Sequence, residues 1–301
     1  LIEQIAITRI DGANKVSPFF IPMAIANMPA GVAGIKFGAK GPNYSTTSAC
    51  ASAGHAIGEA YEIIKRGDAD MMVAGGCEAP VADATIAGFA RMKALSTRNE
   101  EPELASRPFD ADRDGFVIAE GAATLILEDL ERAQRRGARI YAEVLGYGAT
   151  ADANHITAPS PGGMGAVRAA RRALHKAGLE PSDIDLVSAH ATATPEGDPT
   201  ELMGINTLVG EHASEVSVTA TKSSIGHTLG AAGAVAAVAA IKALEEGVVP
   251  PTLNQHQPDE NAGELDLTPL TARERELHVA LLNAFGFGGQ NAATIVQRWE
   301  S

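Results

Sequence analysis

Cysteine is scarce in this chain of 301 residues, which contains only Cys50 and Cys77. No Cys-x-x-Cys pair occurs, so the sequence offers neither a zinc site nor a framework of disulfides. This scarcity is typical of proteins from a reducing compartment. We therefore expect a cytoplasmic protein that holds no metal.

Basic residues are also scarce. The chain has 24 Lys and Arg residues against 37 Asp and Glu residues, which gives a net charge of −13. No basic run offsets this balance, so we expect no nucleic-acid partner. The uncharged stretch 16–35 contains Pro18, Pro22 and Pro29. Three prolines make it a poor membrane span, and no signal peptide is recognisable, so we expect no membrane partner. The first residue is not methionine, and we expect the N-terminal part of the protein to be missing.

The stretch around Cys50 is the most informative part of the sequence. The cysteine lies between a hydroxyl-rich segment, 44–48, and an amphipathic helical pattern that ends at Gly67. This pattern predicts a buried strand that turns into a helix at Cys50. Unpaired N–H groups and the helix dipole would favour the thiolate there and could hold an oxyanion. The alternative is an inert cysteine that packs a strand–helix turn.

The two halves of the chain echo each other. The segment from Phe116 to Ile126 is similar to that from Phe287 to Val296, and the turn at Cys50 is similar to the turn at 222–227. We interpret this as two related α/β halves, 1–138 and 139–301. Equivalent helix N-termini could then meet at one site and bring Cys50 close to His227. Strands are expected near 71–76, 116–127, 140–145, 184–190, 217–222, 278–285 and 292–298, and helices near 164–177 and 228–246.

Further candidate residues lie where expected strands end. His190 and His227 stand among small residues, and Lys222 does the same, where a buried ammonium needs a partner. Each alone could be structural, and Lys222 could extend to solvent. Together with Cys50 they indicate a catalytic site. The glycine-rich loop 285–289 could bring N–H groups to a reacting atom, or it could be a plain hairpin turn.

Four segments carry a resemblance to a known family. They are Thr47-Ser-Ala-Cys-Ala51, Ala189-His-Ala-Thr-Ala-Thr-Pro-Glu-Gly-Asp198, Thr221-Lys-Ser-Ser-Ile-Gly-His227 with the Ala/Gly-rich run after it, and Asn283-Ala-Phe-Gly-Phe-Gly-Gly289. They closely resemble β-ketoacyl-acyl-carrier-protein synthases, and the elongating type II enzymes look nearest. The similarity covers essentially the whole chain. Family members are longer at the N-terminus, so the sequence looks like one that lacks roughly its first quarter.

The resemblance implies a fold and a reaction. The fold is a thiolase-like α-β-α-β-α sandwich of two related halves, and the protein would be a homodimer. The reaction is the decarboxylative Claisen condensation of an acyl thioester with malonyl-acyl-carrier protein in fatty-acid elongation. Acyl-carrier protein would be the partner, and no cofactor is needed beyond the phosphopantetheine that it carries.

The resemblance also assigns catalytic roles. Cys50 would accept the acyl chain, and the Nε–H groups of His190 and His227 would hold the enolate. The N–H groups of Cys50 and Phe287 would hold the acyl oxyanion. Lys222 would set the electrostatics of the site.

Other residues match substrate-binding and docking positions of the family. The substrate-binding residues are Thr192 and Thr194 on the pantetheine arm, with Phe285, Phe287 and Gly288 at the pocket. Because carrier proteins are acidic, docking needs a local basic patch, for which Lys15, Lys93 and Arg98 are candidates. They could equally be ordinary solvated charges.

Two departures and three rivals accompany this assignment. Ala191 replaces a common glycine, and Ala236 stands where many members carry a glutamate, which leaves the partner of Lys222 open. The rivals are a polyketide ketosynthase, a non-catalytic partner subunit that sets chain length, and a cysteine hydrolase. The presence of Cys50 argues against the partner subunit, and two histidines with a lysine fit decarboxylation better than hydrolysis.

Overall fold

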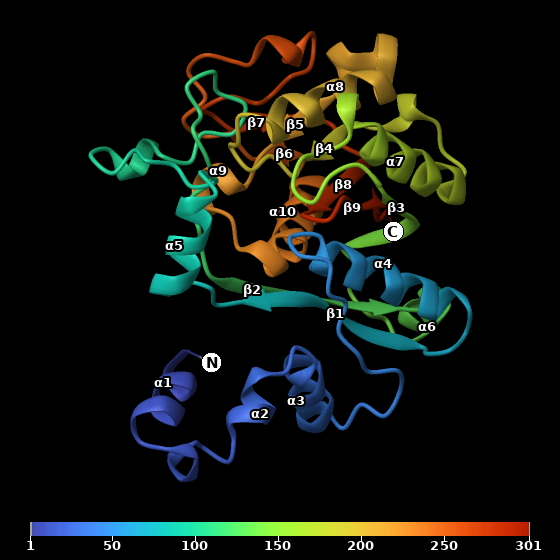
Figure 1. Ribbon diagram of the computed structural model, residues 1–301. Helices are drawn as coiled ribbons and strands as arrows, with labels where there is room; N and C mark the ends of the chain where they lie inside the picture. Colours follow the sequence, from blue (N-terminus) through green and yellow to red (C-terminus); the bar gives the residue numbers. More distant parts are fainter. Residues whose placement is uncertain (1, 301) are drawn as a thin grey trace. The chain divides into compact units, whose positions relative to one another are not determined.

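The computed structural model describes residues 2–300, and the chain forms two compact units, Leu1–Thr47 and Ser48–Ser301. In the first unit three short helices follow one another, α1 (Ile2–Ile10), α2 (Phe20–Ala24) and α3 (Met28–Phe37) (Figure 1). The sequence predicts a loop and one short helix over residues 12–34. The chain instead forms α2 and α3 there, and Pro29 in the first turn of α3 fits the start of a helix.

The second unit contains a five-stranded mixed sheet in the order β3-β9-β8-β4-β5. Its strands are β3 (Ala142–Ala151), β4 (Leu186–Ser188), β5 (Ser217–Thr219), β8 (Val279–Gly286) and β9 (Gln290–Arg298). β4 is parallel to β5 and β8, whereas β9 is antiparallel to both β8 and β3. β4 and β5 are buried along their whole length because both faces of the sheet are covered.

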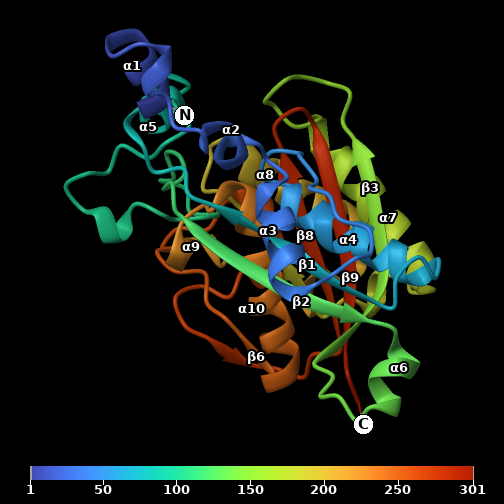
Figure 2. The same cartoon turned by 90° about the horizontal axis from the view of Figure 1, so that it is seen from below.

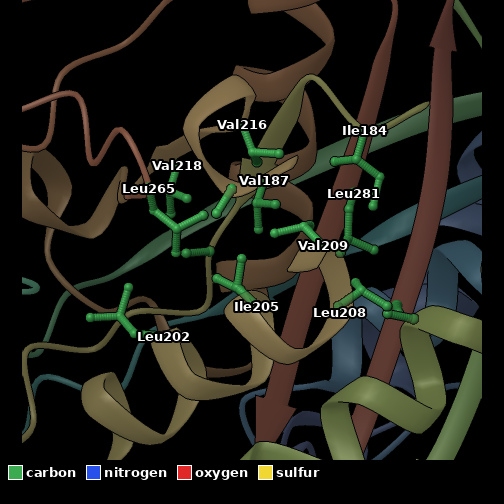
Figure 3. Packing of buried hydrophobic residues seen from close by; sticks show 14 of the residues in the cluster. Ile184, Val187, Leu202, Ile205, Leu208, Val209, Val216, Val218, Leu265 and Leu281 are labelled. Atoms are coloured by element: carbon green, nitrogen blue, oxygen red, sulfur yellow. The ribbon is translucent and has the colours of Figure 1, made fainter. Parts of the chain in front are cut away.

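Two helices cover one face of this sheet, α7 (Met164–Ala177) and α8 (Gly197–Val209). Their apolar side chains interlock with those of the strands, and Figure 3 shows part of this cluster. Ile205, Val187 and Leu281 are each at most 3% exposed. This core holds the strands whose ends carry the candidate catalytic residues.

Two further helices cover the other face, α4 (Ser52–Lys65) and α10 (Ala232–Glu246). They approach closely because small residues meet, and a Cβ on Gly233 would lie 2.7 Å from the backbone N of Gly54. Beyond them lies an antiparallel pair, β1 (Met71–Glu78) and β2 (Gly121–Glu128), as Figures 1 and 2 show. The second unit therefore has four layers, α-β-α-β, of the five expected for the whole fold.

The predicted duplication is visible within the second unit. β1 and β2 pair in the same antiparallel way as β8 and β9, with Val73 opposite Ile126 as Leu281 is opposite Ile295. α4 precedes the first pair as α10 precedes the second. The division between compact units falls at Thr47, so a boundary at residue 138 between the halves stays a prediction.

The outer face of the β1–β2 pair carries apolar side chains. Met71, Val73 and Ile126 are 39%, 43% and 60% exposed, whereas Ala74 and Leu127 point towards the helices and are buried. This alternation is what a half-buried antiparallel pair produces.

The remaining elements are short. They are α5 (Asp83–Arg91), α6 (Leu130–Arg135), α9 (Lys222–Ile225), β6 (Val248–Val249) and β7 (Arg273–Glu274), with several 3₁₀ turns. Helix α7 has the predicted bounds, whereas β2 begins at Gly121 rather than Phe116. The segment before Gly121 instead makes isolated bridges, such as that of Ile118 with His227. Within residues 2–300, no helix combines the length and apolar character needed to cross a bilayer.

Candidate active site

Cys50 lies on a tight turn just before α4. Ala49 has a left-handed φ of 50°, and α4 begins at Ser52. The end of β8 packs against this turn so closely that a Cβ on Gly286 would lie 2.3 Å from the carbonyl oxygen of Ser48. The predicted strand before the cysteine does not form, because residues 44–48 contain only an isolated bridge at Ser48. The turn at Cys50 is therefore held by packing against β8.

The thiol of Cys50 is protonated in this state. Burial raises its pKa to about 11, although the charge of Lys222 and the backbone N–H of Cys50 both lower it. The predicted preference for the thiolate is thus wrong here. Desolvation disfavours the anion more strongly than the start of α4 and the nearby ammonium favour it.

His190 and His227 form an edge-to-face pair beside this turn. Their ring centroids are 5.6 Å apart and their planes meet at 89°. Burial lowers the pKa of both rings well below the usual value, and the charge of Lys222 lowers it further, so both are neutral. Nδ1 of His190 accepts a hydrogen bond from the backbone N–H of Phe285 at 3.3 Å. Its proton therefore lies on Nε2, which is left free to donate.

Lys222 lies behind the histidines and is 4% exposed. Its Nζ donates a hydrogen bond to the carbonyl oxygen of His190. Burial lowers its pKa, while the carboxylate of Glu201 is the first of the charges that raise it. The ammonium thus ties the backbone of His190 to the turn that opens α9.

Glu201 of α8 is the carboxylate whose charge acts most strongly on Lys222. Its carboxylate accepts hydrogen bonds from the backbone N–H groups of His190 and Ala191 at 2.8 and 2.7 Å, and from Nδ2 of Asn283 at 3.1 Å. Sequence reasoning missed this residue. The available signal was an acidic residue on the apolar face of α8, where a carboxylate persists only if it is hydrogen-bonded.

Asp198 is a second buried carboxylate on α8. Burial raises its pKa to about 7, although its Oδ2 accepts a hydrogen bond from the N–H of Phe109 at 2.9 Å. Helix α8 begins at Gly197, and Oγ1 of Thr194 accepts a hydrogen bond from the N–H of Gly197 at 3.2 Å. The side chain of Thr194 thus bonds the first turn from outside the helix.

One cavity of about 610 Å³ brings most of the predicted residues together. The predicted residues that line it are Cys50, His190, His227, Thr192, Thr194, Phe285, Phe287 and Lys93. The residues on either side of Thr192, Ala191 and Ala193, have positive φ values of 29° and 65°. Such strained backbone conformations cluster at functional sites. The hydroxyls of Thr192 and Thr194 lie 3.1 Å apart.

Four predicted residues are not part of this lining, and Lys222, described above, is one of them. Gly288 is not part of the lining, and its N–H donates to the carbonyl oxygen of Ile156 at 2.8 Å. Arg98 forms an ion pair with Glu101 at 3.4 Å outside the cavity. Lys15 belongs to the first unit, so its docking role stays a prediction.

Loop 152–160 supplies a wall of the cavity that sequence reasoning missed. Asp152 accepts from Nδ2 of Asn291 at 2.8 Å, and its N–H donates to the carbonyl oxygen of Gly289 at 2.8 Å. His155 lines the cavity, and its Nδ1 accepts from the N–H of Ala158 at 3.1 Å. No spacing in the sequence pointed to this contact, which depends on the two loops meeting in space. Among residues 2–300, no group of three His, Cys, Asp or Glu side chains is placed to hold a metal ion.

Comparison with known sequences places the chain among condensing enzymes. The family descriptions "Beta-ketoacyl synthase, N-terminal domain" and "Beta-ketoacyl synthase, C-terminal domain" match residues 3–133 and 141–256. A 3-oxoacyl-(acyl-carrier-protein) synthase 2 of Rhizobium meliloti strain 1021 is 52% identical over 97% of this chain and 69% of its own length. The enzyme of the same name from Staphylococcus aureus strain COL is 47% identical over 96% of this chain and 70% of its own length.

Solved structures show the same architecture. A type II PKS ketosynthase in complex with its acyl-carrier protein, AntDE:AntF, is 33% identical, with a TM-score of 0.95 over 99% of this chain and 76% of that one. A beta-ketoacyl synthase from Burkholderia phymatum STM815 is 37% identical, with a TM-score of 0.93 over 99% of this chain and 72% of that one.

Proposed function

The chain belongs to the beta-ketoacyl synthase family, and on that premise we propose that it condenses an acyl thioester with malonyl-acyl-carrier protein, with loss of carbon dioxide, in fatty-acid elongation. The observation that carries this proposal is the meeting of Cys50 with two neutral histidines in one cavity. A nucleophilic sulfur and hydrogen-bond donors for a developing oxyanion are the two requirements of the reaction.

The first step transfers the acyl group to Cys50. The sulfur attacks the carrier thioester, the pantetheine sulfur leaves, and the proton of the Cys50 thiol ends on that leaving sulfur. The ammonium of Lys222 lowers the cost of the transient thiolate. The N–H groups of Cys50 and Phe287 hold the oxyanion of the tetrahedral intermediate.

The second step forms the carbon–carbon bond. Malonyl thioester loses carbon dioxide, and the electron pair of the broken bond moves into an enolate whose oxygen accepts from the Nε2–H groups of His190 and His227. One such donor contributes about 3–4 kcal/mol to a transition state of this kind. The enolate carbon attacks the acyl-Cys50 carbonyl, the thiolate leaves, and a proton from solvent restores the thiol.

Neutral histidines suit this step better than charged ones. A carboxylate that must leave as carbon dioxide would be stabilised by an imidazolium, and that would raise the barrier to its loss. A neutral Nε2–H donates to the enolate oxygen without binding the carboxylate as an ion pair.

Acyl-carrier protein is the proposed partner. In the AntDE:AntF complex a ketosynthase of similar fold is bound to its own acyl-carrier protein, which supports this assignment. Thr192 and Thr194 bind the pantetheine arm, Phe285 and Phe287 close the pocket, and Lys93 contributes to docking. The protein acts as a homodimer in the cytoplasm, where the thiol of Cys50 stays reduced. No cofactor takes part beyond the phosphopantetheine of the carrier.

Polyketide assembly is the second candidate, because the AntDE:AntF neighbour has a TM-score of 0.95. At 33% it is less similar in sequence than the synthase 2 enzymes at 52% and 47%. A non-catalytic partner subunit fits less well, because Cys50 lines the cavity.

The test measures acyl transfer and carbon dioxide release separately. With radiolabelled acyl-carrier protein, the chain should become acylated, and Cys50→Ala should abolish the label while some decarboxylation of malonyl-carrier protein remains. A labelled Cys50→Ala protein would refute the assignment of the nucleophile. Product from tetraketide or longer β-keto substrates, with none from saturated chains, would favour polyketide assembly instead.

A further inference from the structure

A second hollow lies apart from the catalytic cavity. It has a volume of about 730 Å³, and α4, β3 and α7 form its walls. It shares no lining residue with the cavity around Cys50. A volume of this size is within the range of small-molecule sites.

The two helical walls of the hollow carry opposite charge. Helix α7 has the sequence MGAVRAARRALHKA, which contains four Lys and Arg residues and no acidic one, in a chain whose net charge is −13. Arg171, Arg172 and Lys176 of α7 line the hollow. On the opposite wall Glu59 and Glu62 come from α4, and Arg66, which directly follows this helix, is paired with Asp68 at 3.0 Å.

Some of these charges are already engaged. Nζ of Lys176 pairs with Glu62 at 2.6 Å, and Nη1 of Arg172 donates to the carbonyl oxygen of Ala149 at 2.9 Å. By contrast, within residues 2–300 the side chains of Arg171 and Glu59 form no hydrogen bond or ion pair, although the charge of Glu59 acts on the pKa of His55. One guanidinium and one carboxylate on opposite walls therefore remain available to a ligand.

The free guanidinium and the free carboxylate indicate which class of ligand could bind in the hollow. A guanidinium presents a fork of donors that matches phosphate, and Arg172 and Lys176 add positive potential beside it. A free carboxylate accepts from hydroxyl or amino groups. A purely anionic partner, such as an acidic protein segment, would place its charges against Glu59 and Glu62, so a ligand that carries both phosphates and hydrogen-bond donors fits better.

We propose that this hollow is a nucleotide-binding site, with the phosphates on Arg171 of α7 and a sugar hydroxyl or base amino group on Glu59 of α4. The proposal is independent of the condensation reaction, because the residues that carry it lie outside the catalytic cavity. Its ligand is a nucleoside diphosphate or triphosphate, for which we use ADP as the probe.

The test is isothermal titration calorimetry on the full chain after Cys50 has been alkylated with iodoacetamide, which blocks the catalytic cavity. In low salt ADP should bind with a Kd below about 1 mM, whereas adenosine, which lacks the phosphates, should not bind measurably. Arg171→Ala should weaken ADP about tenfold, the loss expected for one charge-assisted hydrogen bond. The matched control is Arg135→Ala, which removes an exposed arginine of α6 that lines neither hollow.

Glu59→Gln separates a nucleotide site from a plain anion site. The change should weaken ADP severalfold and leave inorganic pyrophosphate unaffected or more tightly bound, because it removes a negative charge. The proposal is overturned if ADP gives no heat at millimolar concentration or if Arg171→Ala binds it as the parent chain does. It is also overturned if pyrophosphate binds as tightly as ADP and Glu59→Gln changes neither. Unchanged circular dichroism spectra would show that the variants are folded.

Discussion

The backbone N–H of Phe285 donates a hydrogen bond to Nδ1 of His190 at 3.3 Å. This contact joins the end of β8 to the residue that follows β4, and it fixes which ring nitrogen carries the proton. Because Nδ1 is the acceptor, the donor Nε2–H is available to the substrate. The orientation of this imidazole is therefore set by the backbone of the neighbouring strand.

Removing this imidazole should affect one half-reaction only. We expect His190→Ala to reduce carbon dioxide release from malonyl-carrier protein by about 100-fold or more, because the enolate loses a preorganised donor. Acylation of Cys50 by radiolabelled acyl-carrier protein should continue. Normal release of carbon dioxide by this variant would show that His190 does not hold the enolate.

The decarboxylation rate should not fall as the pH drops from 8 to 6. Burial holds the pKa of His190 and His227 well below the usual value, so both rings stay neutral across this range. The measurement is carbon dioxide release at constant ionic strength, with saturating malonyl-carrier protein. A fall that follows a single titration near pH 6.5 would mean that one of the rings becomes charged there.

Alkylation of Cys50 by iodoacetamide should become faster throughout the range from pH 7 to 10. Its pKa is raised to about 11, so the fraction of thiolate increases about tenfold for each pH unit below that value. Lys222→Met should slow alkylation at pH 8, because the ammonium that lowers this pKa is gone. A rate that levels off near pH 8 in the parent chain would contradict the raised pKa; Cys50→Ala gives the background from Cys77.

Glu201→Gln should damage the site through the hydrogen bonds and the charge of the carboxylate. A neutral amide offers one acceptor oxygen where the carboxylate accepts from His190, Ala191 and Asn283, and it no longer offsets the charge of Lys222. We expect kcat for decarboxylation to fall about tenfold or more, with little change in KM, and the free energy of unfolding to fall by about 1–3 kcal/mol. Glu131→Gln, at an exposed site on α6, should change neither quantity. A large increase in KM alone would indicate a substrate contact instead.

Gly286→Ala should disturb the turn at Cys50, although the two residues are far apart in the sequence. The new Cβ would lie 2.3 Å from the carbonyl oxygen of Ser48, so the turn or the end of β8 must move. Overpacking of this kind costs about 1–3 kcal/mol of stability, which chemical denaturation measures. Gly88→Ala in α5 is the control, because its Cβ would meet nothing within 4 Å. Equal midpoints for the two variants would show that the approach at Gly286 is not tight.

The sequence was sufficient to locate most of the site. Motifs around Cys50, His190 and His227 predicted residues that line one cavity, and the echo between the halves predicted that Cys50 and His227 would come together. The helix expected near 164–177 was also confirmed, as α7. These features are local, because a helix or a turn depends mainly on residues close together in the chain.

What the sequence could not give depends on contacts between distant segments. The sequence left the charge partner of Lys222 open, whereas in the structure the charge of Glu201 from α8 raises its pKa. The prediction that Cys50 prefers the thiolate was wrong. The start of a helix is visible in a sequence, but the depth of burial that raises the pKa of the thiol is not.

The apolar outer face of β1 and β2 has a practical consequence for anyone who purifies this chain. The side chains of Met71, Val73 and Ile126 form an exposed apolar patch. Copies of the protein can associate through such a patch in concentrated solution. We therefore expect light scattering to increase as the protein concentration or the salt concentration rises. Lysine at position 73 or 126 would keep the preparation monodisperse for longer without reaching the catalytic thiol.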